Sequence, residues 1–394
     1  MKKSTIATAV LSALTVSSAF ADVEVGPVIF YGTLQTAVEM INVSANGGTA
    51  ALTKMNESQT RLMDQSSTLG FKGKYAIDGD KFALAQVESR LYLGNNGSNS
   101  DDKTELGSRN TFVGVGSTSM GTVRMGRYDN AYKLSVKQIS NFIKDNVNDA
   151  SGDVGDKQIV NRLGARQGDM VAYESPAMGG VTVNASYNLG KDSTNSISGG
   201  TANNTAKNTV ATDMMPQFAL GVGYAAGPLK IGVGYTTVAN ASWQLDNKKS
   251  AATAVNNAAG AQKLEAYQFG GQYTFGDFSV GALMEQTNSY SDSVGYAQSQ
   301  KTYALVGAYK VTGMEVQVRY ALADDVTGTN TTDTGANQVA VMAAYDLSKN
   351  LKFVGSVTQL TNKKNAAFTS GSGFALPGNG YNMTQIAVGL AAAF

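Results

Sequence analysis

The strongest constraint on this chain is a two-residue alternation of apolar residues with small or polar ones, repeated in short segments along most of the sequence. Near the C-terminus, Ile386, Val388 and Leu390 share one face, and Gln, Gly and Ala occupy the other. Successive side chains of a β-strand point to opposite faces, so this period predicts strands with one apolar face. The same pattern recurs at 181–189, 278–285 and 314–322.

The connections between these segments alternate in length. Short turns rich in Gly, Asp and Pro follow one end of the strands. Long polar connections follow the other end, at 44–60, 94–107, 129–166, 190–212, 244–263, 289–300, 324–336 and 362–380. About sixteen strands result, and an even number with this layout is typical of outer-membrane barrels. We expect an all-β fold, a transmembrane antiparallel β-barrel with short periplasmic turns and long extracellular loops.

The physics of the bilayer favours closure of this sheet. Lipid offers no partner to the free N–H and C=O groups of a sheet edge, so only a closed sheet is stable there. A barrel of about sixteen strands is too wide for its side chains to fill. The faces opposite the apolar ones carry Gly, Ser, Thr, Asn, Gln and occasional charges. These faces therefore predict a water-filled lumen.

Composition excludes several other classes of protein. The chain has no Cys and no His, which removes disulfides, thiolate nucleophiles, His metal ligands and Ser-His-Asp triads. We therefore expect no enzyme activity, no metal and no cofactor. Lys and Arg number 31 against 30 Asp and Glu, a balance that argues against a nucleic-acid partner.

The first 21 residues have the features of a secretory signal peptide. Lys2 and Lys3 form a charged start, an apolar stretch follows at 6–16, and Ala19 and Ala21 give a small-x-small cleavage site. We expect residues 1–21 to be removed on export, and residues 22–394 to form a single barrel domain.

Several motifs resemble those of Gram-negative general porins, especially the β-proteobacterial, neisserial-like group. Each motif is weak alone, but they occur in order over nearly the whole chain, at 28–34, 67–73, 109–114, 121–127 and 171–176, with an aromatic Phe394 at the end. The resemblance implies an outer-membrane homotrimer of 16-stranded barrels for passive diffusion of ions and small hydrophilic solutes. It also implies that the third long loop folds into the pore.

That third loop is the segment 129–166, the longest connection in the sequence. It carries an amphipathic patch at 134–143 followed by several Asp residues. We expect the patch to pack on the barrel wall, and Asp145, Asp149 and Asp153 to face the lumen. An exposed extracellular loop is the alternative.

Basic residues on the polar faces of strands are the candidates for the opposite side of the constriction. A charge facing lipid near the middle of the bilayer costs about 2–4 kcal/mol, so these side chains should point inward. The candidates are Lys72, Lys74, Arg90, Arg109 and Arg124, and the neighbours of Arg109 leave its direction undecided. Thr68 and Gln35 stand where the resembling family often has Arg and Lys, which puts strong anion selectivity in doubt.

The terminal Phe394 has two compatible interpretations. It is an aromatic anchor at the lipid interface, and in the resembling family such a residue is also read by the outer-membrane assembly machinery. Two other functions stay open for the whole chain, a solute-specific channel and a surface adhesin or anchor barrel.

Overall fold

The computed structural model describes residues 23–25, 28–46, 58–93, 106–140, 159–189, 216–239, 262–291, 296–369 and 379–394. These residues form β-strands almost throughout, with one α-helix, α2 (Ala131–Ser140). In the described part of the chain, no helix has the length and apolar character needed to cross a bilayer.

The chain begins with the small β1 (Val23–Val25) and with β2 (Val28–Ala45). The next strands are β3 (Ser58–Asp64), β4 (Thr68–Asp78), β5 (Lys81–Arg90), β6 (Thr111–Ser117), β7 (Gly121–Asp129), β8 (Arg166–Glu174), β9 (Val181–Asn188), β10 (Gln217–Ala226) and β11 (Leu229–Val238). The strands that follow are longer except for β15, and they are β12 (Gln262–Phe275), β13 (Phe278–Ser291), β14 (Tyr296–Val311), β15 (Met314–Ala323), β16 (Ala336–Ser348), β17 (Leu351–Asn362) and β18 (Tyr381–Ala393).

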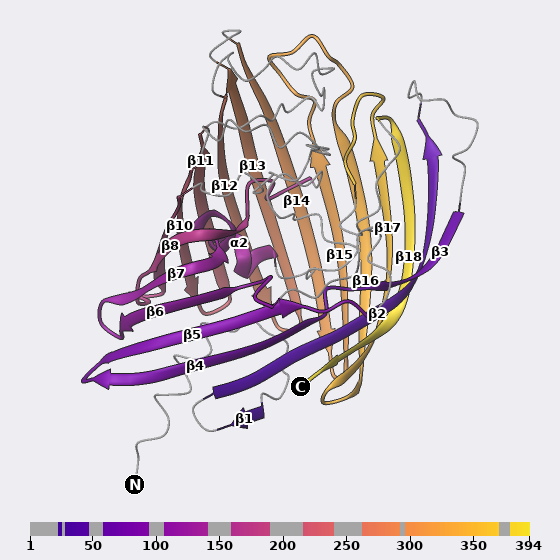
Figure 1. Ribbon diagram of the computed structural model, residues 1–394. Coiled ribbons are helices and arrows are strands. Elements are labelled where there is room, and N and C mark those ends of the chain that lie inside the picture. The colour runs from indigo at the N-terminus through magenta and orange to yellow at the C-terminus, as the bar shows by residue number, and fades with distance from the viewer. Residues whose placement is uncertain are drawn as a thin grey trace.

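The sheet closes on itself through antiparallel pairs. Apart from β3, each strand pairs with the next along the chain, and β18 pairs with β2 to complete the ring (Figure 1). β3 pairs with residues 36–42 of β2 and β4 with residues 28–33, so together they fill one place in the ring. The described strands β2–β18 therefore make a closed 16-stranded barrel, and the predicted fold is confirmed.

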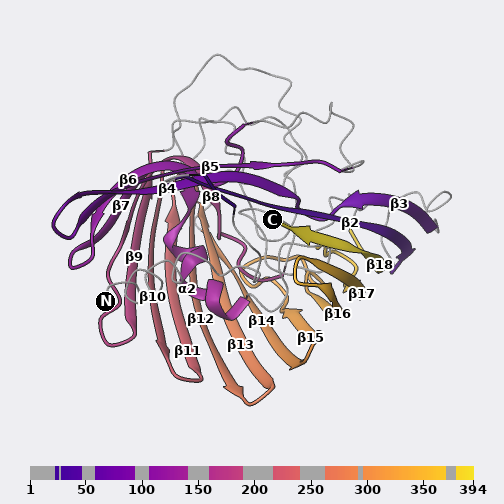
Figure 2. The ribbon, with the colours of Figure 1, turned by 90° about the horizontal axis from the view of Figure 1, so that it is seen from below.

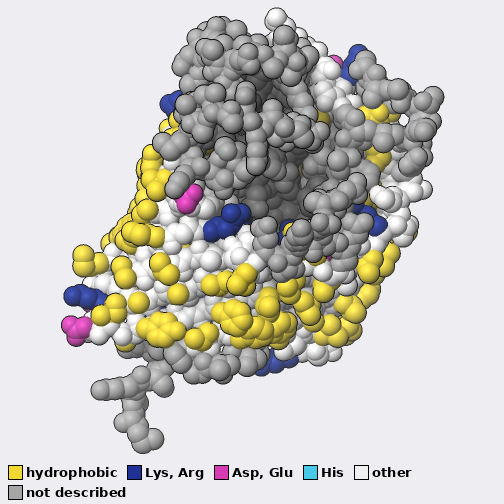
Figure 3. Space-filling view, in the orientation of Figure 1, with side chains coloured by type: hydrophobic (Ala, Val, Ile, Leu, Met, Phe, Trp, Pro, Cys, Tyr) yellow, Lys and Arg dark blue, Asp and Glu magenta, His cyan; other side chains and the backbone are white. Residues whose placement is uncertain are grey.

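The alternation in the sequence separates the two surfaces of this barrel. Outward residues such as Val38, Met40 and Leu305 are about half exposed, while their inward neighbours Glu39 and Ile41 are buried. Apolar side chains gather over the lower part of the face seen in Figure 3. A lipid-facing band of this kind is what a membrane barrel requires.

The seam of the barrel involves the terminal residue. The N–H of Phe394 donates to the carbonyl of Gly32 at 3.1 Å, and the N–H of Gly32 donates to the carbonyl of Phe394 at 3.0 Å. The Phe394 ring lies 5.5 Å from the ring of Phe30 and covers Gly32, where a Cβ atom would come within 2.6 Å of it. Phe394 thus fastens the last strand to β2.

Candidate functional site

The helix α2 lies inside the barrel, against the inner faces of β10, β11 and β12 (Figure 2). It begins directly after β7, and Asn130 caps it by accepting the N–H of Lys133 at 2.8 Å. Its first N–H, from Ala131, donates to the hydroxyl of Ser186 on β9 at 2.9 Å. The start of the third loop is therefore tied to the wall by side chains that satisfy the open end of the helix.

Two glycines make room for this helix. A Cβ atom at Gly221 would lie 2.3 Å from the carbonyl oxygen of Ala131, and one at Gly232 would lie 2.0 Å from that of Ser135. Gln268 on β12 then donates its side-chain N–H to the carbonyl of Tyr132 at 2.5 Å. The sequence analysis gave no role to these glycines as the seat of the helix. The available clue was the pair of Gly-x-Gly repeats on adjacent strands.

The returning half of the loop, residues 159–165, is also bound to the wall. Glu285 on β13 accepts the backbone N–H groups of Asn161 and, at 3.1 Å, Arg162, and the Thr287 hydroxyl donates to it at 3.1 Å. The Arg162 guanidinium donates to the side-chain oxygen of Gln300. Burial lowers the pKa of Arg162 to about 10 while Glu285 opposes the shift, so Arg162 stays charged at neutral pH. One buried carboxylate thus holds the end of the loop.

A second connection contributes to the interior. Asn362, at the end of β17, donates its amide N–H groups to the carbonyls of Phe368 at 2.9 Å and Tyr381 at 2.7 Å. It also accepts the N–H of Phe368 at 2.9 Å. These hydrogen bonds hold the Phe368 ring against the guanidinium group of Arg162, whose carbon lies 5.3 Å from the ring centre. Sequence reasoning placed residues 362–380 in a loop and gave no sign of this inward turn.

These two segments cover part of the inner faces of β10–β18, which we call the packed wall. Val136, Ile159, Val160 and Phe368 form an apolar cluster with inward residues of these strands, such as Leu283. Gln300 and Thr358, two inward polar residues of the covered part, are at most 1% exposed. The covered part of the packed wall therefore behaves as the core of a folded domain.

The inner faces of β2–β8, which we call the charged wall, carry ion pairs as well as a buried apolar cluster on β5–β8 that includes Phe82 and Met170 and against which Leu134 of α2 packs. Arg61 lies 3.0 Å from Glu39, and Arg90 lies 3.6 Å from Asp64. Asp64 also accepts the N–H groups of residues 66 and 67, where the wall is interrupted between β3 and β4.

A second cluster of charged and aromatic residues surrounds Glu88 on the charged wall. Arg109 contacts Glu88 at 2.7 Å, and the hydroxyl of Tyr31 donates to the other oxygen of Glu88 at 2.9 Å. Lys72 lies over the ring of Tyr31, 4.8 Å from its centre, and Lys74 lies over Phe82 at 3.6 Å. Lys72 and Lys74 alternate with the exposed Phe71 and Tyr75, which places them on the inner face.

The junction of the third loop with the barrel adds a third cluster. Asp129 ends β7 and lies 3.1 Å from Arg166, 3.4 Å from Lys133 and 3.8 Å from Lys137. The lysines come from α2 and Arg166 begins β8. One carboxylate thus joins three cations where the chain enters and leaves the lumen.

Several of these pairs bury the carboxylate more than the cation. The side chains of Glu39 and Asp64 are 0% exposed and that of Asp129 is 3% exposed, whereas Arg90 on the charged wall is 36% and Lys137 on α2 is 39% exposed. Arg109 and Glu88 are equally exposed at 14%, and in the pair of Arg124 and Glu174 the carboxylate is the more exposed partner. Arg90 and Lys137 are therefore the open cations among these groups.

The remaining predicted site residues are placed as follows. Arg124 points inward but is only 2% exposed, because it pairs with Glu174 at 3.1 Å beneath the rings of Phe112 and Tyr128. Arg109 precedes β6 and bends inward to Glu88. Asp145, Asp149 and Asp153 lie outside the described residues, as do residues 1–22 with the predicted signal peptide.

A closed barrel with a helix inside and a charged wall opposite it defines a membrane barrel with an internal passage. The model of the Gram-negative porin family matches residues 7–365, and the chain therefore belongs to that family of outer-membrane proteins.

Individual relatives agree with this assignment. The chain is 30% identical over 192 residues to the major outer membrane protein P.IB of Neisseria meningitidis serogroup A, which is 48% of this chain and 50% of that protein. The chain thus spans about half the length of the curated relatives it matches. An anion-selective porin from Comamonas acidovorans has a similar fold, with a TM-score of 0.68, 22% identity, and coverage of 93% of this chain and 99% of that one. The trimer form of OmpT from Vibrio cholerae gives a TM-score of 0.63 at 14% identity, over 94% and 100%.

Proposed function

We propose that this protein is a passive diffusion channel for ions and small hydrophilic solutes, with a moderate preference for anions. The observation that carries the proposal is the exposure of two cations, Arg90 on the charged wall and Lys137 on α2, while the carboxylates paired with them, Asp64 and Asp129, are covered. An anion entering this passage meets accessible positive charge, whereas a cation must approach carboxylates that are already paired.

The passage in this proposal runs between the charged wall and α2. The helix is seated on the packed wall, so the narrow part of the lumen is shifted toward β2–β8. Solutes with separated charges orient in the electric field there. Apolar solutes are disfavoured because they would have to displace ordered water. Thr68 and Gln35 add no charge to this wall, which keeps the preference moderate.

The loop acids Asp145, Asp149 and Asp153 complete the proposed constriction from the side of the third loop. Lys72, Lys74, Arg90 and Arg109 form its basic side. We assign Arg124 to support of the wall, because its guanidinium is buried beneath Phe112 and Tyr128.

The assembly and chemistry of the protein are part of the same proposal. We infer a homotrimer, which the fold similarity to the trimer form of OmpT supports. We propose that Phe394, which closes the seam, also serves the assembly machinery. We assign no catalytic activity to the chain, because the sequence has no His and the lumenal carboxylates named above are paired with cations.

Planar bilayer recording under a KCl gradient tests the ion preference. We expect a reversal potential of the sign for anions, reduced in Arg90→Gln and Lys137→Gln. Lys263→Gln, which removes an exposed cation from the outward face of β12, serves as the matched control and should leave the potential unchanged. A reversal potential of the sign for cations in the unmodified protein would contradict the proposal.

A further inference from the structure

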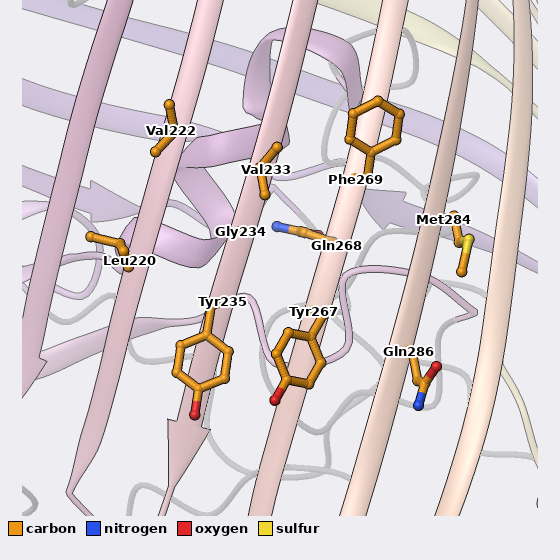
Figure 4. A pocket seen from close by; sticks show the side chains of 10 residues that line it. All are labelled: Leu220, Val222, Val233, Gly234, Tyr235, Tyr267, Gln268, Phe269, Met284 and Gln286. Atoms are coloured by element: carbon orange, nitrogen blue, oxygen red, sulfur yellow. The ribbon is translucent and has the colours of Figure 1, made fainter.

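The outer surface of the barrel has a groove that the channel does not use. It has a volume of about 400 Å³ and crosses β10 to β13 (Figure 4). The apolar side chains that line it come from two rows across the four strands, and they include Leu220, Val222, Val233, Tyr267, Phe269 and Met284. In Figure 4 these side chains stand on the near side of the strands and α2 lies behind them, so the groove faces away from the lumen.

The rows of this groove follow from strand register. Tyr235 pairs with Tyr267 in one row, and Val233 pairs with Phe269 in the next. Residues two apart on a strand are separated by about 7 Å, so the groove extends at least this far along the strands. A hydrocarbon chain running parallel to the strands fits such a depression, because its surface is apolar and elongated.

A polar cluster lies immediately beyond the groove at the long-loop end. Glu265 belongs to the outward face of β12, as do Tyr267 and Phe269, yet it is only 8% exposed. The Tyr235 hydroxyl donates to Glu265 at 3.2 Å, and Tyr290 also hydrogen-bonds it. Lys263 forms an ion pair with the same carboxylate.

This cluster leaves a cation available to a ligand. The Lys263 side chain is 53% exposed. Its ammonium group has three N–H donors, and the ion pair with Glu265 involves one carboxylate oxygen. Lys263 lies second in β12, at the strand end that follows a long connection. A charged pair facing outward is tolerated near the interface rather than at mid-bilayer. The cluster therefore lies at the depth of lipid headgroups, with the groove directly below it at the depth of acyl chains.

We propose that β10–β13 hold a phosphorylated lipid of the surrounding leaflet, with an acyl chain in the groove and its phosphate on Lys263. The apolar groove recognises the chain, and the exposed ammonium complements the anionic headgroup. The site depends on the barrel lying in a membrane and is independent of conduction.

Native mass spectrometry of the folded full-length protein in a neutral detergent tests this assignment. The probes are phosphatidylglycerol, which is anionic, and phosphatidylcholine with the same acyl chains. We expect one saturable phosphatidylglycerol site per protomer. Lys263→Gln should weaken it about fivefold, since one Lys near a membrane surface has roughly this effect on anionic lipid. Binding of phosphatidylcholine should be unchanged in this variant.

Two matched controls separate the site from general surface effects. Lys363 is 51% exposed and paired with Asp325, much like Lys263, so Lys363→Gln should leave lipid binding unchanged. Tyr267→Ala should weaken both lipids, whereas Tyr320→Ala, at a similarly exposed outward Tyr on β15, should not. The proposal would be overturned if Lys263→Gln and Lys363→Gln weakened phosphatidylglycerol binding equally. It would also be overturned if Lys263→Gln left phosphatidylglycerol binding unchanged, or if Tyr267→Ala left lipid binding unchanged.

Discussion

The charged wall and the packed wall arise from the same strand pattern but become different environments. Both alternate apolar outward residues with inward residues, and both expose their outward side chains to a similar extent. The packed wall is covered over part of its height by residues 131–140, 159–165 and 363–369, and its inward residues there are buried like those of a soluble core. The charged wall keeps an exposed cation, Arg90. What lies against a strand, rather than the strand itself, decides whether its inner face is a core or a channel lining.

Release of the third loop from Glu285 should have the largest effect on the difference between the two walls. Glu285→Ala removes the acceptor of two backbone N–H groups and the carboxylate whose charge stabilises the buried Arg162. Breaking a buried charge pair costs about 3–5 kcal/mol. We expect a clear rise in single-channel conductance and a lower thermal midpoint.

Glu315→Ala is the control for that variant. Glu315 is an inward residue of β15 that accepts a hydrogen bond from Gln317 at 2.5 Å, two residues away on the same strand. Its loss should change conductance little. If Glu285→Ala conducts like the unmodified protein, the loop is held by other contacts.

A smaller disturbance comes from filling the seat of the helix. Gly232→Val places side-chain atoms where the carbonyl of Ser135 lies, and overpacking of this kind costs about 1–3 kcal/mol. The helix should move toward the charged wall and lower the conductance. Gly307→Val, where a new Cβ would meet no atom within 4 Å, is the control and should behave as the unmodified protein.

Removal of one cation from the charged wall should have a smaller effect on the channel than the two changes to the third loop. Arg90→Gln removes an exposed cation and uncovers Asp64. We expect the ratio of anion to cation permeability to fall roughly twofold, since a single charge at this range is screened by water and salt. Bilayer recordings of reversal potential measure the ratio, and an unchanged or increased ratio would count against Arg90 as part of the pore lining.

The smallest expected effect is at a turn outside both walls. The hydroxyls of Ser117 and Ser119 donate to Asp80 at 2.5 and 2.6 Å and hold the pKa of that carboxyl below its usual value. A carboxyl with a depressed pKa stabilises the fold above its unfolded pKa, and this is lost as pH falls. Asp80→Asn should therefore lower the melting temperature slightly at neutral pH, with a difference that shrinks below about pH 4. Conductance should not change.

The barrel itself could be predicted from the sequence because its signals are local. Alternation along one strand, and Gly, Asp and Pro at turns, fix the faces and the connections without knowledge of distant partners. The third loop was also predictable in outline, since the amphipathic patch predicted at 134–143 overlaps α2.

The interior could not be predicted because its contacts join residues far apart in the chain. Glu285 meets residues 161 and 162, and Asn362 meets Phe368 and Tyr381, only after the ring has closed. Arg124 shows that predicting the orientation of a side chain does not predict its burial. Alternation places it correctly on the inner face, but only the packing of Phe112 and Tyr128 reveals that it is buried.

The most direct test of the two-wall arrangement uses the absence of Cys, because a single introduced Cys is then the only thiol in the chain. Gln35→Cys lies on the charged wall and Thr358→Cys on the packed wall, where Thr358 is 0% exposed. A negatively charged thiol reagent added during bilayer recording should reduce the conductance of Gln35→Cys within minutes and leave Thr358→Cys unmodified. Equal reaction of both thiols would contradict the division of the lumen into a conducting wall and a packed one.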